Sequence, residues 1–120
     1  MHSLQANGLT ATAEDTGCPR IVVLSGRLDA VSQASAEQFL EAVAASGAKR
    51  IVLDCAGIEF ISSAGIRPLL TLVKRVKPLG GGVSVCAARP HVRQLLEFSG
   101  LKLLLSIADS VDGGCAALLH

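Results

Sequence analysis

Short apolar runs alternate with longer segments of helical periodicity along much of the chain. Arg20–Ser25 and Arg50–Cys55 are nearly continuous apolar runs, which are typical of buried strands in the centre of a sheet. Between these runs, apolar residues recur at helical spacing from Ala36 to Ala44, and Gly47 supplies a helix stop. This order of elements predicts a sheet with helices packed against it.

The segment after the second apolar run predicts a crossover connection. It is long enough to contain a helix and to return to a parallel neighbouring strand at Val83–Ala87. An apolar stripe from Ile66 to Val76 marks the helix, and cationic residues occupy its last turns. Because a proline is tolerated only near a helix start, Pro68 predicts that the regular helix begins near Gly65.

The C-terminal third predicts a short helix after Pro90, a last strand near Leu103–Ile107 and a final helix from about Asp109. Two adjacent glycines, Gly113 and Gly114, interrupt the final helix. Since a glycine within a helix costs on the order of 1 kcal/mol relative to alanine, we expect this helix to be frayed or to start late.

Residues 1–15 are expected to be a flexible N-terminus, in which Leu9–Glu14 is a candidate edge strand because polar and apolar residues alternate weakly there. Residues 1–120 are therefore predicted to form a single α/β domain. Its sheet is expected to be mixed but mostly parallel, with four to five strands and about four helices.

The amino-acid composition is that of a globular protein, and it argues against nucleic-acid binding and membrane insertion. Hydrophobic residues make up 50% of the 120 residues and charged residues 18%, so the chain can bury enough apolar surface to fold. The net charge is +1, charges are scattered along the sequence, and Trp and Tyr are absent, so we expect no nucleic-acid partner. No apolar run approaches the roughly 20 residues that cross a bilayer, and residues 1–15 lack a signal-peptide pattern. We therefore expect a cytoplasmic protein without direct membrane insertion.

The cysteines predict neither a metal site nor a cofactor site. Cys18, Cys55, Cys86 and Cys115 lie far apart and form no Cys-x-x-Cys pair. Cys55 and Cys86 belong to apolar runs, where a thiol acts as a small hydrophobic side chain.

Ser62 and Ser63 stand directly before the apolar stripe of the crossover helix. Serine in this position is commonly a helix N-cap, which is one interpretation of both residues. The other is a phosphorylation site, because the free N–H groups and the dipole at a helix N-terminus stabilise a phosphate. Spacing alone leaves both interpretations open.

Four short motifs follow one another in the chain: Gly26-Arg27-Leu28-Asp29, Leu53-Asp54-x-x-Gly57, Phe60-Ile61-Ser62-Ser63-Ala64-Gly65, and Gly80-Gly81 before a strand. In this order and spacing they resemble the STAS domain, the family of bacterial anti-sigma factor antagonists. The resemblance covers roughly Arg20 to the C-terminus.

In phosphorylated members of that family, an Asp precedes the acceptor serine, and a second Ser or Thr and then a Gly follow it. Aligned on Gly65, the resemblance implies Ser63 as the acceptor, with Ser62 as the alternative. Ser62 then stands in place of the Asp, and Ala64 in place of the second hydroxyl residue. The resemblance also implies a partner-binding surface that contains Asp29, Ser62, Ser63, Ala64, Gly65 and Arg67.

Two acidic residues of the motifs also have structural interpretations. Asp29 matches an acidic residue on the family's partner-facing surface, and it equally suits the cap of a turn or of the following helix. Asp54 is expected to bond backbone N–H groups in the loop that follows its strand.

The resemblance implies a non-enzymatic partner switch. The unphosphorylated protein is expected to bind an anti-sigma factor serine kinase, phosphorylation of Ser63 to release that kinase, and a phosphatase to reset the switch. The alternative is a cytoplasmic regulatory subunit of a lipid or anion transporter, without a phosphorylation cycle. We expect a monomer or a weak dimer.

An enzyme is not expected from the sequence. A phosphoaspartate receiver with Asp54 as acceptor needs acidic residues near its first strand to hold Mg²⁺, and Arg20–Leu28 contains none. The three histidines lie far from Ser62 and Ser63 in the sequence, so no hydrolytic set is apparent.

Overall fold

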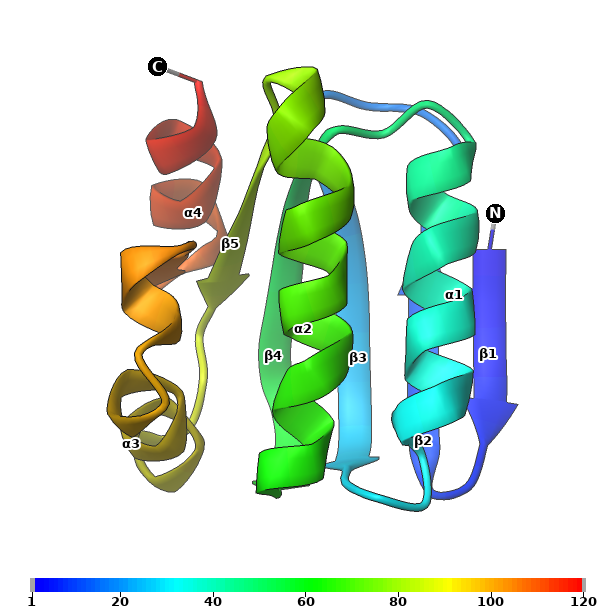
Figure 1. Cartoon of the computed structure of the whole chain (residues 1–120), viewed down its shortest axis with the longest axis vertical. Coiled ribbons are helices and arrows are strands. Elements are labelled where there is room, and N and C mark those ends of the chain that lie inside the picture. Colours follow the sequence, from blue (N-terminus) through cyan, green and yellow to red (C-terminus); the bar gives the residue numbers. More distant parts are fainter. Residues whose placement is uncertain (1, 120) are drawn as a thin grey trace.

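A computed structural model describes residues 2–119 and contains one six-stranded sheet with helices on both faces (Figure 1). The strands are β1 (His2–Ala6), β2 (Leu9–Ala13), β3 (Arg20–Leu28), β4 (Arg50–Ile61), β5 (Gly82–Cys86) and β6 (Ser106–Ala108). The helices are α1 (Gln33–Ala45), α2 (Ser63–Val76), α3 (Pro90–Phe98) and α4 (Val111–Leu118). Two short 3₁₀ turns, η1 (Lys77–Leu79) and η2 (Leu101–Leu103), complete the described elements.

The strands lie in the sheet in the same order as in the chain. From β3 to β6 all pairs are parallel, as expected from the crossover helices between them, whereas β1, β2 and β3 pair antiparallel. The predicted α/β class and mixed, mostly parallel sheet are confirmed.

The N-terminal hairpin corrects the expectation for residues 1–15. Residues 2–13 form two strands, so Leu9–Ala13 is an inner strand between β1 and β3 rather than the edge. A two-residue turn at Asn7-Gly8, with φ of 57° and 83°, joins them. Asn-Gly is the strongest short sequence signal for a hairpin, because both residues tolerate positive φ. With this hairpin the sheet has six strands rather than the four to five predicted.

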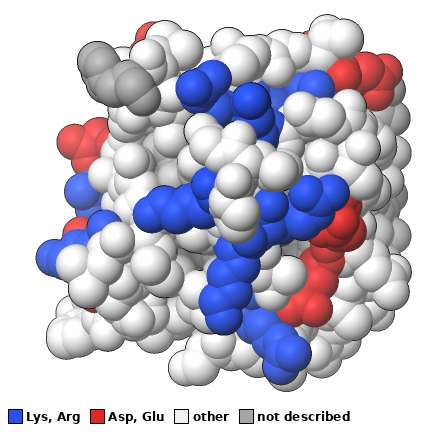
Figure 2. Space-filling view, turned by 45° about the horizontal axis from the view of Figure 1, so that its top comes forward, with Lys and Arg blue, Asp and Glu red and all other residues white. Residues whose placement is uncertain are grey.

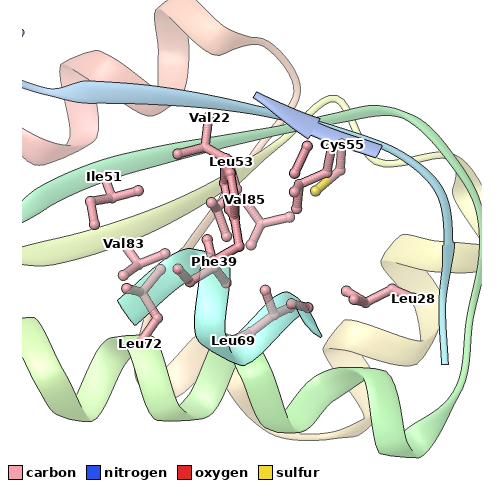
Figure 3. Packing of buried hydrophobic residues seen from close by; sticks show 14 of the residues in the cluster. Val22, Leu28, Phe39, Ile51, Leu53, Cys55, Leu69, Leu72, Val83 and Val85 are labelled. Atoms are coloured by element: carbon pink, nitrogen blue, oxygen red, sulfur yellow. The ribbon is translucent and has the colours of Figure 1, made fainter. Parts of the chain in front are cut away.

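Most of the core lies between the sheet and the helices α1 and α2. Figure 3 shows Phe39 of α1 and Leu69 and Leu72 of α2 packed toward Leu53 and Val85 in the sheet. Side chains alternate between the two faces of a strand, so the residues next to these core positions point to the opposite face of the sheet. There they contact α4 in a smaller hydrophobic cluster. That cluster contains Val52, Cys86 and Leu118.

The C-terminal elements differ from the sequence-based prediction. The last strand is β6 at Ser106–Ala108, because Leu101 turns into the core while Leu103 is 81% exposed in η2. The final helix is neither delayed nor shortened by its glycines and begins at Val111. The Ser110 hydroxyl accepts a hydrogen bond from Gly113 N (3.1 Å) and caps this helix.

The two central strands continue well beyond their apolar runs. Arg27 lies opposite Phe60, and Leu28 opposite Ile61, after two register shifts in the β3–β4 pair. These extensions end at the same end of the sheet, where β3 leads to the turn before α1 and β4 leads directly into α2. The carboxyl ends of two neighbouring parallel strands therefore carry the predicted site.

Candidate functional site

The helix α2 begins at Ser63, two residues earlier than predicted. Ser62 N donates a hydrogen bond to the Leu28 carbonyl (3.0 Å), and Gly65 N donates to the Ser62 carbonyl (2.9 Å). These bonds fix the first turn against the end of β3. The expectation that Ser63 precedes the helix is therefore wrong, because contacts with β3 form the first turn despite the proline that follows.

Pro68 lies inside α2 and is buried. Having no N–H, it cannot donate to the Ala64 carbonyl, the partner it would have in a regular helix. The helix nevertheless continues to Val76, and the side chain packs into the interior. Tertiary packing thus outweighs the local preference on which the predicted start near Gly65 depended.

Gly65 sets the distance between α2 and β3. A β-carbon at this position would lie 2.0 Å from the Leu28 carbonyl oxygen, far inside van der Waals contact. Only glycine permits this approach, which explains why the residue is needed in the turn and why it is buried.

The two serines have different surroundings. Ser62 occupies the N-cap position with an extended backbone, but its hydroxyl oxygen is buried and has no hydrogen-bond partner among residues 2–119. The hydroxyl therefore does not act as a cap. Ser63 is the first helical residue and is exposed, and Ala64 beside it is half-buried.

Asp29 organises the turn between β3 and α1. Its Oδ1 accepts hydrogen bonds from Val31 N (3.0 Å) and Ser32 N (3.2 Å), and its Oδ2 pairs with Arg27 Nε (3.2 Å). The Ser32 backbone bond is the largest cause of a lowered Asp29 pKa, with the Arg27 bond also contributing. The turn-capping interpretation of Asp29 is confirmed, and the residue lies at the same sheet edge as Ser63.

Asp54 bonds a backbone N–H as expected, but β4 continues to Ile61, so the bond lies within the strand and not in a loop after it. Its Oδ1 accepts a hydrogen bond from Ala56 N (3.1 Å), next to the irregular part of the β3–β4 pair. The bond secures the local turn of the strand.

Arg27 and Phe60 add a feature that sequence analysis missed. The Arg27 guanidinium carbon lies 4.5 Å from the centre of the Phe60 ring, a cation–π contact across β3 and β4. Phe60 is 38% exposed and Val31 in the nearby turn is 69% exposed. Arg27 and Phe60 belong to the motifs identified in the sequence, but the contact between them follows from the register of β3 and β4.

Arg67 projects from α2 one turn after Ser63. Its Nε pairs with Glu37 Oε1 of α1 at 3.3 Å, and its side chain remains 72% exposed. Of the six predicted partner-binding residues, Ser63 and Arg67 are therefore exposed, Asp29, Ser62 and Ala64 are half-buried and Gly65 is buried. All six lie around the junction of β3, β4 and α2.

Positive charge gathers at the opposite end of the sheet. Figure 2 shows Lys and Arg side chains gathered on one face of the molecule. The basic residues near the start of β4 and the end of α2, the basic patch, are Lys49, Arg50, Lys74, Arg75 and Lys77. The backbone bond from Gly82 N to the Lys49 carbonyl (2.9 Å) joins the first residue of β5 to the residue before β4. Scattering along the sequence is thus a poor guide to the charge distribution in space.

The thiols and acidic groups offer little further chemistry. Burial raises the pKa of Cys55 to about 12 and also raises that of Cys86, so both remain protonated. Within residues 2–119, no group of three or more His, Cys, Asp or Glu side chains could hold a metal ion. None of the helices in that range is long and apolar enough to cross a bilayer.

Known proteins share both the sequence pattern and the fold. The STAS domain family model matches residues 10–114. The Bordetella bronchiseptica protein named "Putative anti-sigma factor antagonist BtrV" is 37% identical over 90 residues, which cover 72% of this chain and 78% of that protein. The "Anti-sigma F factor antagonist" of Paenibacillus polymyxa is 35% identical over 91 residues, covering 75% and 78%.

A solved structure extends the comparison to almost the whole chain. The crystal structure of an anti-sigma factor antagonist from Mycobacterium paratuberculosis superposes with a TM-score of 0.84 and 26% sequence identity. It covers 98% of this chain and 100% of that one. The present chain belongs to the STAS domain family.

Proposed function

We propose that this protein is an anti-sigma factor antagonist that binds an anti-sigma serine kinase through the surface around Ser63 and releases it when Ser63 is phosphorylated. Two relatives above 30% identity carry the name of anti-sigma factor antagonist, which supports the class. In this scheme the chain is a binding partner and kinase substrate rather than an enzyme, and a phosphatase resets it.

The contrast between the two serine hydroxyls carries the choice of Ser63. A kinase must bring the hydroxyl in line with the γ-phosphorus of ATP, so the acceptor has to be reachable from solvent. The Ser63 side chain is exposed, whereas the Ser62 hydroxyl oxygen is buried beneath the same turn. The geometry therefore favours Ser63 over its neighbour.

The reaction itself needs little from this chain beyond the hydroxyl. The Ser63 oxygen forms a bond to the γ-phosphorus of kinase-bound ATP, the bond from that phosphorus to ADP breaks, and the hydroxyl proton passes to a base of the kinase. The product carries about −1.5 to −2 additional charge. A single neighbouring arginine does not offset a dianion fully, and a partner that covers Ser63 would have to desolvate the phosphate, so the contact that presents Ser63 is lost after modification.

The surroundings of Ser63 suit a protein partner. Phe60 and Val31 present exposed apolar surface, Arg27 lies over the Phe60 ring, and Arg67 lies one turn after Ser63 on α2. Aromatic and arginine side chains are enriched among the residues that dominate binding energy in interfaces. The rigid turn at Asp29 holds this surface in place before a partner arrives.

Intact-mass analysis tests the acceptor directly. The protein is incubated with ATP and each anti-sigma kinase of its own organism, as wild type, Ser62→Ala and Ser63→Ala. We expect wild type and Ser62→Ala to gain one phosphoryl group and Ser63→Ala to gain none, with ATP-free reactions as the control.

Two results would contradict the proposal. A mass gain that persists in Ser63→Ala and disappears in Ser62→Ala would move the site to the buried serine. No gain with any kinase, together with copurification with a membrane transporter, would favour the regulatory-subunit alternative.

A further inference from the structure

A row of polar residues runs along α2 from Ser63. Ser63, Arg67, Thr71 and Arg75 follow one another at intervals of four, so they lie on one face of the helix. This face is turned toward α1: Arg67 pairs with Glu37, Thr71 Oγ1 lies 3.4 Å from the same carboxylate, and Arg75 pairs with Glu41 at 3.0 Å. Ser63 is the first member of a row whose other members contact α1.

Arg67 is loosely engaged in this row. Its Nε lies 3.3 Å from Glu37 Oε1, and Glu37 is the acidic residue with which it pairs. The side chain is 72% exposed, and exposed ion pairs of this kind contribute little to stability. Moving the guanidinium away from Glu37 is therefore inexpensive.

We propose that Arg67 binds the phosphate of Ser63-phosphorylated protein and leaves Glu37 to do so. This inference rests on the proposed modification of Ser63. Residues four apart on a helix have β-carbons about 5–6 Å apart, within the reach of an arginine side chain. A dianionic phosphate with three acceptor oxygens attracts the arginine fork more strongly than a singly charged carboxylate does.

The other nearby cation is less free to respond. Arg27 already bonds Asp29 at 3.2 Å and lies over the Phe60 ring at 4.5 Å. Moving Arg27 would break both the ion pair and the cation–π contact, whereas moving Arg67 would break one ion pair. Arg67 is therefore the cation that the phosphate recruits.

The exchange carries the effect of phosphorylation to α1. Glu37 loses its arginine and retains the Thr71 hydroxyl, so a negative carboxylate becomes exposed beside the new phosphate. A partner that contacts both helices would meet two changed charges from a single modification.

Phosphorus NMR of protein with phosphoserine encoded at position 63 tests the exchange without any kinase. A nearby cation stabilises the dianion and lowers the second pKa of the phosphate from its usual value near 6. We expect Arg67→Gln to raise that pKa by about 0.5 or more. Glu37→Gln removes a competing anion, so it should lower the pKa.

The Arg75–Glu41 pair supplies matched controls, because it is the same kind of pair about two turns farther along α2. Arg75→Gln and Glu41→Gln should leave the phosphate pKa unchanged. An unchanged pKa in Arg67→Gln, an equal effect of Arg75→Gln, or a larger effect of Arg27→Gln would overturn the proposal. Because the phosphoserine is encoded, these outcomes are independent of whether a kinase modifies Ser63.

Discussion

Ser62 and Ser63 are chemically identical neighbours that the fold places in opposite environments. The hydroxyl of Ser62 turns inward beneath the start of α2, and the side chain of Ser63 faces solvent. Their positions depend on the close approach of Gly65 to the Leu28 carbonyl. Accessibility of the acceptor is thus controlled by a residue that offers no side chain at all.

A substitution at Gly65 should disturb both the fold and the site. Gly65→Ala places a β-carbon where the Leu28 carbonyl oxygen lies, 2.0 Å away. Overpacking of this kind costs about 1–3 kcal/mol, more than the gain of up to about 1 kcal/mol from helix propensity. We expect a lower free energy of unfolding in urea and slower phosphorylation of Ser63.

Gly100→Ala is the control for a loss of stability far from the site. A β-carbon there meets no atom within 4 Å, but φ is +79°, which costs a side-chain residue about 1–2 kcal/mol. This variant should be destabilised while its phosphorylation rate stays normal. Full stability of Gly65→Ala would show that α2 does not need its close contact with β3.

At this scale, the sequence could predict which residues belong to the site but not how they are used. The motif around Ser63 and the charge of Asp29 are visible in the chain. Burial of the Ser62 hydroxyl and the Arg27–Phe60 contact depend on how β3 and β4 pair after two register shifts, which no local pattern encodes.

Among the elements, α4 shows how packing reverses a helix propensity. A β-carbon on Gly114 would lie 2.1 Å from Cys86 Sγ and 2.8 Å from Ser84 Oγ, so glycine lets α4 approach β5. At Gly113 the nearest atom is Ser110 Oγ at 3.3 Å. Of these two positions, Gly114 is the one at which close packing against β5 requires glycine.

Alanine at these two positions should have unequal effects. Gly113→Ala is expected to change the free energy of unfolding little, because a gain of about 0.5–1 kcal/mol in helix propensity is opposed by a close contact of 3.3 Å with the capping Ser110 hydroxyl. Gly114→Ala is expected to destabilise the protein by about 1–3 kcal/mol through overpacking against β5. Thermal and urea unfolding of the pair measure the difference, and equal or greater stability of Gly114→Ala than wild type would contradict the packing account.

Element types were largely predictable, because apolar runs and helical stripes report which face is buried. The residues at which the helices and strands begin and end were not predictable, because tertiary contacts determine them. The β4 strand extends beyond β5 because Arg89 Nε bonds the Ala56 carbonyl (3.2 Å) and His91 Nε2 the Glu59 carbonyl (2.7 Å). These bonds, from the N-cap residue Arg89 and the first turn of α3, take the place of bonds to a neighbouring strand.

The proposed partner surface and the basic patch lie at opposite ends of the central strands. The proposed partner surface lies at the carboxyl ends of β3 and β4, and the basic patch lies at their amino ends (Figure 2). A strand and the helix that returns antiparallel to it bring residues distant in sequence to the same end of the sheet, as with Lys49 before β4 and Lys77 after α2. The parallel crossover units were predictable from the alternating pattern, whereas the N-terminal hairpin and this grouping of charge were not.

Binding of the anti-sigma kinase that modifies the protein tests the partner switch most directly. Isothermal titration calorimetry would compare unmodified protein, Ser63→Ala and protein with phosphoserine encoded at position 63. Phosphoserine encoded at Ser3, an exposed residue of β1, is the control for added charge. We expect phosphoserine at position 63 to weaken kinase binding by roughly 100-fold. Ser63→Ala and the protein with phosphoserine at position 3 should bind the kinase like wild type. Equal affinity of the kinase for protein with and without phosphate on Ser63 would contradict the proposed switch.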